Sequence, residues 1–395
     1  MTRRFLFVDV NASFVNPTRN LLPLAFLKAG DTRFFGPGYV SSECLARGLS
    51  SFIDQEGPFD VVVSNTLVLF SDSGDPAHYA ATLSASYAYH GPKEDLLYLP
   101  IIAKQFSALT LPRVAILLEN DFYNWTSNEA DKILARSDFF IGFGEEFSPL
   151  RADLPHLHQE RFAKSATDVW TDFSRSHRNK IASLLHFISD AEFLISPLSS
   201  RTLPWSVMGV QYHARSVARD ALKRAGIDPV TDTKFRKFIS LLKKTHVMRG
   251  EKSWVQKALN ANFMSRLAQT RYSFTCGSGL EMPIRKFFEI PAVGSLLVCR
   301  AFKGFEAAGF SDGVNCLVAE PDDLADVHFE LTAHPGRYEA MARAGQKLIL
   351  ESHSVDARAR DLGAILNAIT AKTFHGSQWI AGRHILRSPS EPGAK

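Results

Sequence analysis

The sequence predicts an α/β protein with two domains, each built on a parallel sheet that carries helices on both faces. Short apolar runs rich in Val, Ile and Phe alternate with segments of helical periodicity along most of the chain, and this alternation is typical of parallel sheets. The 395 residues also exceed what one hydrophobic core usually organises. We expect a first domain over residues 1–195, a second over 196–370 and a polar, partly disordered tail over 371–395.

The first domain follows from six apolar runs with the character of strands. The expected strands cover residues 4–10, 32–38, 59–70, 113–120, 138–144 and 191–198. Segments with helical periodicity lie at 19–30, 41–57 and 127–137. Three strands joined by two helices make one half of a doubly wound sheet, and ligands of such sheets bind beyond the carboxyl ends of the strands.

The second domain repeats this plan. The expected strands cover 272–276, 295–299 and 315–320, and the expected helices cover 213–226, 234–244, 322–333 and 337–352. The segment 196–215 is rich in polar and aromatic residues for a linker. Arg201 and Trp205 in this segment either line the cleft between the domains or belong to a packed hinge.

Composition and charge argue against several classes of protein. The formal net charge of +4 does not indicate a nucleic-acid binder with a strongly basic surface. The four cysteines are scattered, without a CxxC pair or a metal-ligand spacing. The first apolar run stops at Asp9 without a cleavage site, and no window reaches the roughly 18 apolar residues of a membrane span. We expect a cytoplasmic protein with at most peripheral contact at the inner face of the membrane.

The stretch "GSGLEMPIRKFFEIPAVGSLLVC" directly follows the expected strand 272–276 and holds the best candidates for a binding site. Gly277 and Gly279 allow a tight turn, and Pro283 suits the first turn of a helix over 283–292. On this prediction Glu281 lies in the loop before the helix and Glu289 almost two turns inside it. Two carboxylates therefore bracket a helix N-terminus.

Basic residues at this helix start indicate an anionic ligand. Free N–H groups and about half a positive charge favour an anion at a helix N-terminus, most often a phosphate. The positive charges of Arg285 and Lys286 lie near the positive end of the helix dipole, which destabilises the helix. A bound phosphate would offset this repulsion. The carboxylate of Glu289 can accept hydrogen bonds from the two hydroxyls of a ribose. The arrangement suits a nucleotide diphosphate, with solvated surface charges as the alternative.

These residues and the segment after them resemble the donor-binding region of retaining glycosyltransferases with the GT-B fold. The resemblance rests on two glutamates with seven residues between them, a proline in the loop, a helix end with small residues and an apolar strand. The order "DGVNCLVAEPDDL", "HPGRYEAMARAG" and "HSVDAR" is similar to the C-terminal region of the "glycosyl transferases group 1" family. The variant "RKFFEIPAVGSLLV" is most similar to its spore-maturation-like subgroup, and the resemblance covers about residues 270–365.

The resemblance implies a GT-B fold and transfer of a sugar from a nucleotide-diphosphate sugar to a hydroxyl of a glycan or lipid-linked acceptor. It also implies retention of configuration, and no cofactor is expected. We expect no metal, because no DxD-type pair of acidic residues stands at the end of an expected strand. Glu289 would bind the ribose hydroxyls, Glu281 would lie near the donor sugar or its diphosphate, and Arg285 would neutralise the diphosphate. The remaining expected donor contacts are Gly277, Gly279, Pro283, Lys286 and Arg201.

The chain also departs from the family pattern. The loop between the glutamates reads "MPIRKFF" in place of several glycines. The family's Arg and Lys pair early in the second domain has no clear match, and Arg201, Arg236 and Arg249 are the possible substitutes.

The first domain is expected to hold the acceptor. Asn11 and Ser13 follow its first strand, and Asp121 follows the fourth, where it orients an acceptor hydroxyl or takes its proton, unless it only caps a helix. An epimerase or hydrolase of nucleotide sugars and a noncatalytic interaction protein stay open as other functions. A nucleic-acid-binding module is disfavoured, because no recognised motif accompanies the basic segment 231–271.

Overall fold

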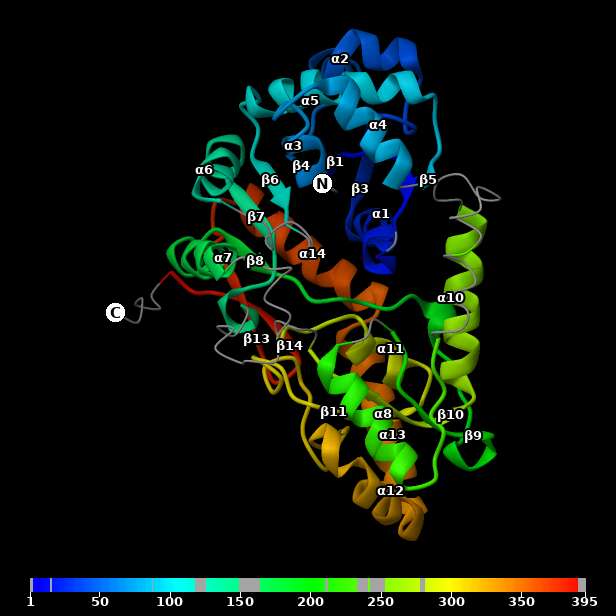
Figure 1. Cartoon of the computed structure of the whole chain (residues 1–395). Coiled ribbons are helices and arrows are strands. Elements are labelled where there is room, and N and C mark those ends of the chain that lie inside the picture. The colour runs from blue at the N-terminus through cyan, green and yellow to red at the C-terminus, as the bar shows by residue number, and fades with distance from the viewer. Residues whose placement is uncertain are drawn as a thin grey trace.

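Two parallel sheets form the framework of the computed structural model (Figure 1). The structure describes residues 3–14, 16–86, 88–117, 126–148, 164–209, 212–232, 241, 253–277 and 281–389. The first sheet has six strands in the order β3-β1-β4-β6-β7-β8, and the second has four in the order β12-β11-β10-β9. All strand pairs within these two sheets are parallel. The expected class, α/β with two Rossmann-like sheet domains, is confirmed.

The first sheet lies between two layers of helices. Its strands are β1 (Arg4–Val8), β3 (Asp31–Phe35), β4 (Val61–Asn65), β6 (Arg113–Ile116), β7 (Phe139–Gly142) and β8 (Ile181–Ser183). Successive side chains of a strand point to opposite faces. Phe5 and Phe7 therefore join one apolar cluster, while Leu6 and Val8 join another. Because both faces are apolar, both need a covering layer.

One face of the first sheet is covered by α1 (Pro17–Ala29) and by α14 (Val355–Thr370), a helix from the far end of the chain. The other face is covered by α2 (Ser42–Glu56), α3 (Thr66–Leu69), α4 (Pro76–Ser86), α5 (Leu99–Ser107), α6 (Ser127–Arg136) and α7 (Lys164–Ser176). A two-stranded antiparallel pair, β2 (Ala12–Ser13) and β5 (Ala88–Tyr89), lies beyond the end of β1.

The second sheet is shorter and is built in the same way. Its strands are β9 (Leu203–Ser206), β10 (Thr270–Thr275), β11 (Leu296–Cys299) and β12 (Leu317–Val318). Helices α8 (His213–Arg224), α12 (Leu324–Ala333) and α13 (Pro335–Ser352) enclose the cluster on one face, which centres on Trp205 and Tyr338. Helix α11 (Lys286–Ala292) packs on the other face, and α10 (Ser253–Ala268) precedes β10.

The end of the chain returns to the first sheet instead of forming a loose tail. Helix α14 packs against α1, and the antiparallel strands β13 (Ser377–Ile380) and β14 (Arg383–Leu386) follow it. Trp379 in β13 is buried, and its Nε1 donates a hydrogen bond to the carbonyl of Ser183 at 3.0 Å. The prediction of a partly disordered tail from residue 371 is therefore wrong for residues 371–389.

Two strand predictions are also wrong. The last strand of the first sheet is Ile181–Ser183, within the segment that precedes the expected strand at 191–198. Residues 191–198 form no strand, and Ile195 there is 95% exposed. Strand β9 lies within the segment 196–215, for which the sequence predicts a linker between the domains and no strand. It is the edge strand of its sheet, which is where a strand tolerates proline.

Candidate active site

The loops after the strands of the two sheets meet at the interface between the domains. The ring centroids of Phe147, after β7, and Phe302, after β11, lie 6.5 Å apart. Lys303 Nζ donates a hydrogen bond across the interface to the carbonyl oxygen of Glu145 at 2.9 Å. The carboxyl ends of both sheets therefore face a common region, where ligands of such sheets bind.

A buried ionic cluster of Glu192, Arg285 and Glu289 lies at this interface. Arg285 Nη2 is 2.8 Å from both carboxylate oxygens of Glu192, which lies after β8, and Nη1 donates to Glu289 Oε1. Arg285 is 7% exposed and Glu289 is 5% exposed. Two carboxylates therefore already engage the guanidinium of Arg285, which fixes the carboxylate of Glu289, and the role of Arg285 at a diphosphate stays a prediction.

The cluster keeps Glu289 ionised. Burial acts to raise the pKa of Glu289, but the positive charges of Arg285 and Lys286 outweigh it and hold the pKa below its ordinary value. Burial likewise acts to lower the pKa of Arg285, and Glu289 with Glu192 outweighs it in the opposite direction. Glu289 is therefore a carboxylate that only accepts hydrogen bonds, as a contact to two hydroxyl groups requires.

The helix that carries this cluster begins later than the sequence suggested. Helix α11 starts at Lys286, and Arg285 is its N-cap residue. Pro283 therefore lies before the helix rather than in its first turn, and Glu289 lies in the first turn rather than almost two turns inside. The helix has only 7 residues, so its dipole is a weak source of positive charge.

Two basic side chains converge on Gly209, beyond the carboxyl end of β9. A Cβ atom at this glycine would lie 2.4 Å from Lys286 Cε and 2.7 Å from Arg215 Nη1. Its φ of +107° is in the region that favours glycine. Arg215 is 1% exposed, and its Nη2 donates to Thr275 Oγ1 at 3.1 Å. Lys286 Nζ lies 4.0 Å from Glu289 Oε2. Arg215 and Lys286 are thus next to the ionic cluster.

Glu281 lies in a strained loop. Its φ is +52°, which is uncommon for a residue with a side chain and is often found at functional sites. The loop folds back on Gly277, where a Cβ atom would be 2.8 Å from Glu281 Cα, so glycine is required. Glu281 Oε1 lies 3.1 Å from Arg300 Nη2, an ion pair that does not have hydrogen-bond geometry. The sequence predicted the glycine turn but not the role of Arg300.

Arg201 is at the opposite end of the second sheet. It is 3% exposed, and its guanidinium donates to the carbonyl oxygens of Thr270, Ser196 and Val293. Thr270 is the first residue of β10, so these contacts lie at the amino ends of the strands. The side chain of Arg201 therefore satisfies buried backbone carbonyls away from the carboxyl ends of the strands, and its contact to the donor stays a prediction. Trp205 is fully buried in the core and does not line a cleft.

Several predicted residues fall outside the described ranges. Asp121 and Gly279 are among them, as are the substitutes Arg236 and Arg249. Their assignments stay predictions.

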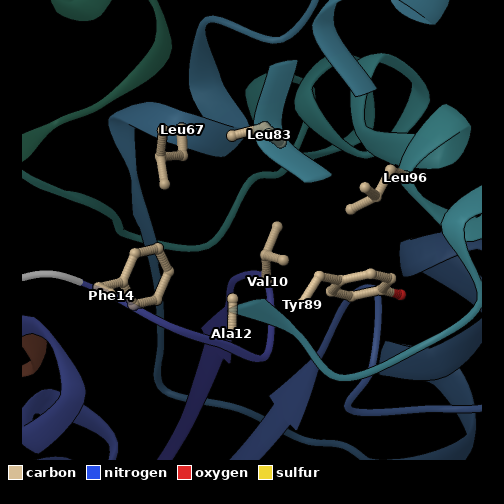
Figure 2. Close-up of a pocket in the computed structure, with 7 residues that line it drawn as sticks. All are labelled: Val10, Ala12, Phe14, Leu67, Leu83, Tyr89 and Leu96. Atoms are coloured by element: carbon tan, nitrogen blue, oxygen red, sulfur yellow. The ribbon is translucent and has the colours of Figure 1, made fainter. Parts of the chain in front are cut away.

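On the side of the first domain, an apolar hollow lies beyond the ends of β1 and β4. Figure 2 shows its lining, which consists of Val10, Ala12, Phe14, Leu67, Leu83, Tyr89 and Leu96. The free space is about 10 Å³, which is close to the room needed by one water-sized group. Beside it, Ser13 Oγ and His90 Nε2 are hydrogen-bonded at 2.9 Å. In this conformation the hollow admits a methyl or methylene group, and a sugar ring is too large for it.

Within the described ranges, no group of three or more His, Cys, Asp or Glu residues has the arrangement of a metal site. Among the same residues, none of the helices combines the length and the apolar character needed to cross a membrane.

Comparison with known proteins agrees with this geometry. Residues 192–364 match the family model described as glycosyl transferase-like. The chain has the GT-B fold. Its fold is similar to that of HepE from Anabaena in complex with UDP, with a TM-score of 0.52 and 11% identity over 92% of this chain and 100% of HepE. It is also similar to a glycosyltransferase from Rickettsia africae, with a TM-score of 0.50 and 12% identity over 94% and 99%. No curated protein sequence matches it.

The most informative residues that sequence reasoning missed are Arg215 and Glu192. Arg215 stands in "HARSVARD", six residues after Gly209, so a search for cations following the loop after β9 would have found it. Glu192 is 93 positions from its partner Arg285, and no local pattern connects the two residues.

Proposed function

We propose that the chain is a glycosyltransferase that moves a sugar from a nucleotide-diphosphate sugar to a hydroxyl group of an acceptor. The observation that carries the proposal is the convergence of Arg215 and Lys286 on Gly209, beside the carboxylate of Glu289. Basic side chains that meet at the carboxyl end of a parallel sheet favour an anion there. The UDP named for the HepE structure supports a nucleoside diphosphate as this anion.

The reaction requires stabilisation of the leaving group. As the bond between the anomeric carbon and the diphosphate oxygen breaks, negative charge develops on that oxygen. We assign Arg215 and Lys286 to this charge, at roughly 1.5–3 kcal/mol for each charge-assisted hydrogen bond. They take the place of the predicted Arg285, which is already engaged by two carboxylates.

The two glutamates have different roles in this proposal. Glu289 accepts hydrogen bonds from the ribose hydroxyls, and Arg285 is a positioning residue that fixes its carboxylate through Glu192. Glu281, held in a left-handed conformation, is assigned to the donor sugar or its diphosphate. Gly277 has no side chain, which allows the backbone of Glu281 to pack against it.

Retention of configuration is a part of the proposal that rests on the family resemblance. Independence of a metal is a part that rests on the lack of a DxD-type pair of acidic residues at the end of an expected strand. The basic side chains of the site supply positive charge from the protein itself, which fits a reaction without a metal. Closure of the domains would exclude water and limit hydrolysis of the donor.

We propose a lipid-linked acceptor ahead of a free glycan. The apolar hollow beyond β1 accepts a slender hydrocarbon group but no sugar ring, while the hydrogen-bonded pair of Ser13 and His90 beside it suits a hydroxyl group. Asp121 is kept as the candidate for orienting the acceptor hydroxyl. A cytoplasmic location with peripheral contact at the membrane would follow from such an acceptor.

A thermal-unfolding screen with UDP, GDP, ADP, CMP and dTDP tests the donor site, since a ligand that binds the folded state raises its apparent stability. We expect one nucleoside diphosphate to stabilise the wild type and Glu289→Gln to lose most of the effect. The matched control is Glu351→Gln, which removes an exposed carboxylate that pairs with Lys347. Equal stabilisation of Glu289→Gln and Glu351→Gln by the nucleotide would contradict the ribose role of Glu289. If no nucleotide stabilises the wild type, the donor proposal is wrong.

The transfer itself is tested with the sugar derivative of the stabilising nucleotide. Donor consumption that needs a lipid-linked acceptor supports the transferase. Consumption at the same rate without any acceptor would indicate a hydrolase or epimerase instead.

A further inference from the structure

A second pocket, outside the interface between the domains, lies where α7 ends and the chain leaves β14. Its volume is about 400 Å³, within the range of small-ligand sites. Three arginines line it, namely Arg175, Arg178 and Arg387, together with His375 and small polar residues. None of these residues belongs to the candidate active site. Strand β13 contacts β8, the strand that follows α7 in the chain (Figure 1).

The segments that form the pocket are fixed to one another. A Cβ atom on Gly376, whose φ is +88°, would lie 2.1 Å from the carbonyl oxygen of Arg178, so the two backbones are in close contact. The backbone N–H of Arg387 donates to the carbonyl of Gly376 at 2.9 Å, and its Nε lies 3.4 Å from the carbonyl oxygen of Ser377. The arginines are therefore carried by a defined backbone frame that joins α7 to the end of the chain.

The charge of the pocket selects an anionic ligand. No acidic residue is found among its described lining residues. Arg175 has carboxylate partners outside the lining, Glu145 at 3.2 Å and Asp172 at 3.8 Å. Guanidinium groups stay charged at every physiological pH and match the geometry of phosphate oxygens in pairs. Arg178, Arg387 and His375 are the N–H donors of the lining that a phosphate in this pocket can contact.

We propose that this pocket binds a phosphate ester at a site separate from the donor diphosphate. The ligand is the phosphate of a lipid headgroup or that of a soluble phosphate ester such as a sugar phosphate. The site goes beyond the proposed transfer reaction, because none of its residues is assigned to donor or acceptor. In either case binding is electrostatic and weakens as salt is added.

The test uses the full chain and a double charge reversal, Arg178→Glu with Arg387→Glu. Its matched control is Arg337→Glu with Lys347→Glu, two residues of α13 whose side chains are 59% and 72% exposed. Both double variants lower the formal net charge from +4 by the same amount. Co-sedimentation compares phosphatidylglycerol-containing vesicles with phosphatidylcholine alone, and calorimetry measures binding of glucose 1-phosphate and of inorganic phosphate.

We expect the reversal in the pocket to weaken binding about tenfold or more, on the basis of roughly 1 kcal/mol per basic residue near an anionic membrane and 1.4 kcal/mol per tenfold change. The control should bind as the wild type does. If the pocket variant loses vesicle binding, the ligand is a lipid headgroup. If it loses only the binding of glucose 1-phosphate, the ligand is a soluble phosphate ester. Absence of all binding in the wild type, or equal loss in both double variants, overturns the proposal.

Folding and donor binding are checked in the same samples. Stabilisation by the nucleotide found in the donor screen should be unchanged in both double variants. If the pocket variant fails to fold, Arg178→Gln with Arg387→Gln replaces it, because these changes remove the charge without reversing it. A normal nucleotide response together with lost phosphate binding separates this site from the active site.

Discussion

Substitution of Gly209 by alanine tests the assignment of the diphosphate site most directly. The new Cβ atom would lie 2.4 Å from Lys286 Cε and 2.7 Å from Arg215 Nη1, so both side chains must move away from the end of β9. Alanine at a φ of +107° adds about 1–3 kcal/mol of backbone strain. The matched control is Gly226→Ala, because Gly226 has a φ of +76° but no atom within 4 Å of the added Cβ.

The two variants should differ in nucleotide binding. Loss of one charge-assisted hydrogen bond of about 1.5 kcal/mol weakens binding roughly tenfold. At a nucleotide concentration of about 100 times the wild-type Kd, stabilisation of the folded state would then fall from about 2.7 to about 1.4 kcal/mol. Gly226→Ala should lose stability through backbone strain and keep the full nucleotide effect.

Urea unfolding with and without the nucleotide, together with calorimetry, measures both quantities. Wild-type affinity for the nucleotide in both Gly209→Ala and Gly226→Ala would refute the reasoning, since the displaced cations would then have no role in binding. A loss of affinity in both variants would point to strain in the second domain instead.

Three further outcomes follow from the described contacts. Arg201→Met should lower the free energy of unfolding by about 3 kcal/mol or more, because three buried carbonyls lose their donor. Its nucleotide affinity should stay the same, as in the exposed control Arg343→Met. A loss of affinity in Arg201→Met alone would support a contact of Arg201 to the donor. Glu192→Gln should weaken nucleotide binding through Glu289, while leaving the fold intact by circular dichroism, and unchanged affinity would contradict the positioning role of Arg285. His353→Gln should flatten the dependence of stability on pH below about 6.5, as measured by urea midpoints at pH 7.5 and 5.

The direction of the pH effect follows from the environment of His353. Burial, with a contribution from the charge of Arg358, lowers the pKa of His353 to about 3, whereas the unfolded chain has the ordinary value of about 6.5. Between these values the unfolded state binds a proton that the folded state does not, so stability is lost as the pH falls. From pH 7.5 to pH 5 the expected loss is about 2 kcal/mol for this group. The same loss in His353→Gln would show that other groups cause it.

The sequence predicted the central strands well, because their residues are apolar on both faces. Val61 to Val63 and Phe5 to Phe7 are continuous apolar runs, which is the pattern of strands buried on both faces of a parallel sheet. It failed at Ile181–Ser183, where a strand of three residues is too short to show a period, and at β9, where Pro204 is tolerated only at a sheet edge. The polar composition after residue 371 concealed the burial of Trp379.

The candidate site was predicted in part. The pattern from Gly277 to Glu289 located the loop and the helix, since glycine, proline and charge spacing are local signals. Whether Arg201 faces the ligand or the far end of the sheet depends on the strand β9, which the sequence did not reveal. The engagement of Arg285 depends on Glu192, which is distant in sequence. Burial and long-range ion pairs therefore decide which charged residues are available for a ligand.

The return of the chain to the first sheet has a consequence for biosynthesis. The apolar face that holds Phe5 and Phe7 is complete only when α14 has left the ribosome. Roughly 190 residues separate the end of β8 from the end of α14, which at a synthesis rate of about 5–20 residues per second is a delay of ~10–40 s. During that time the first sheet exposes surface that other chains can bind. We expect premature termination before α14 to yield a fragment that aggregates. The first domain can therefore complete its fold only after the last part of the chain has been synthesised.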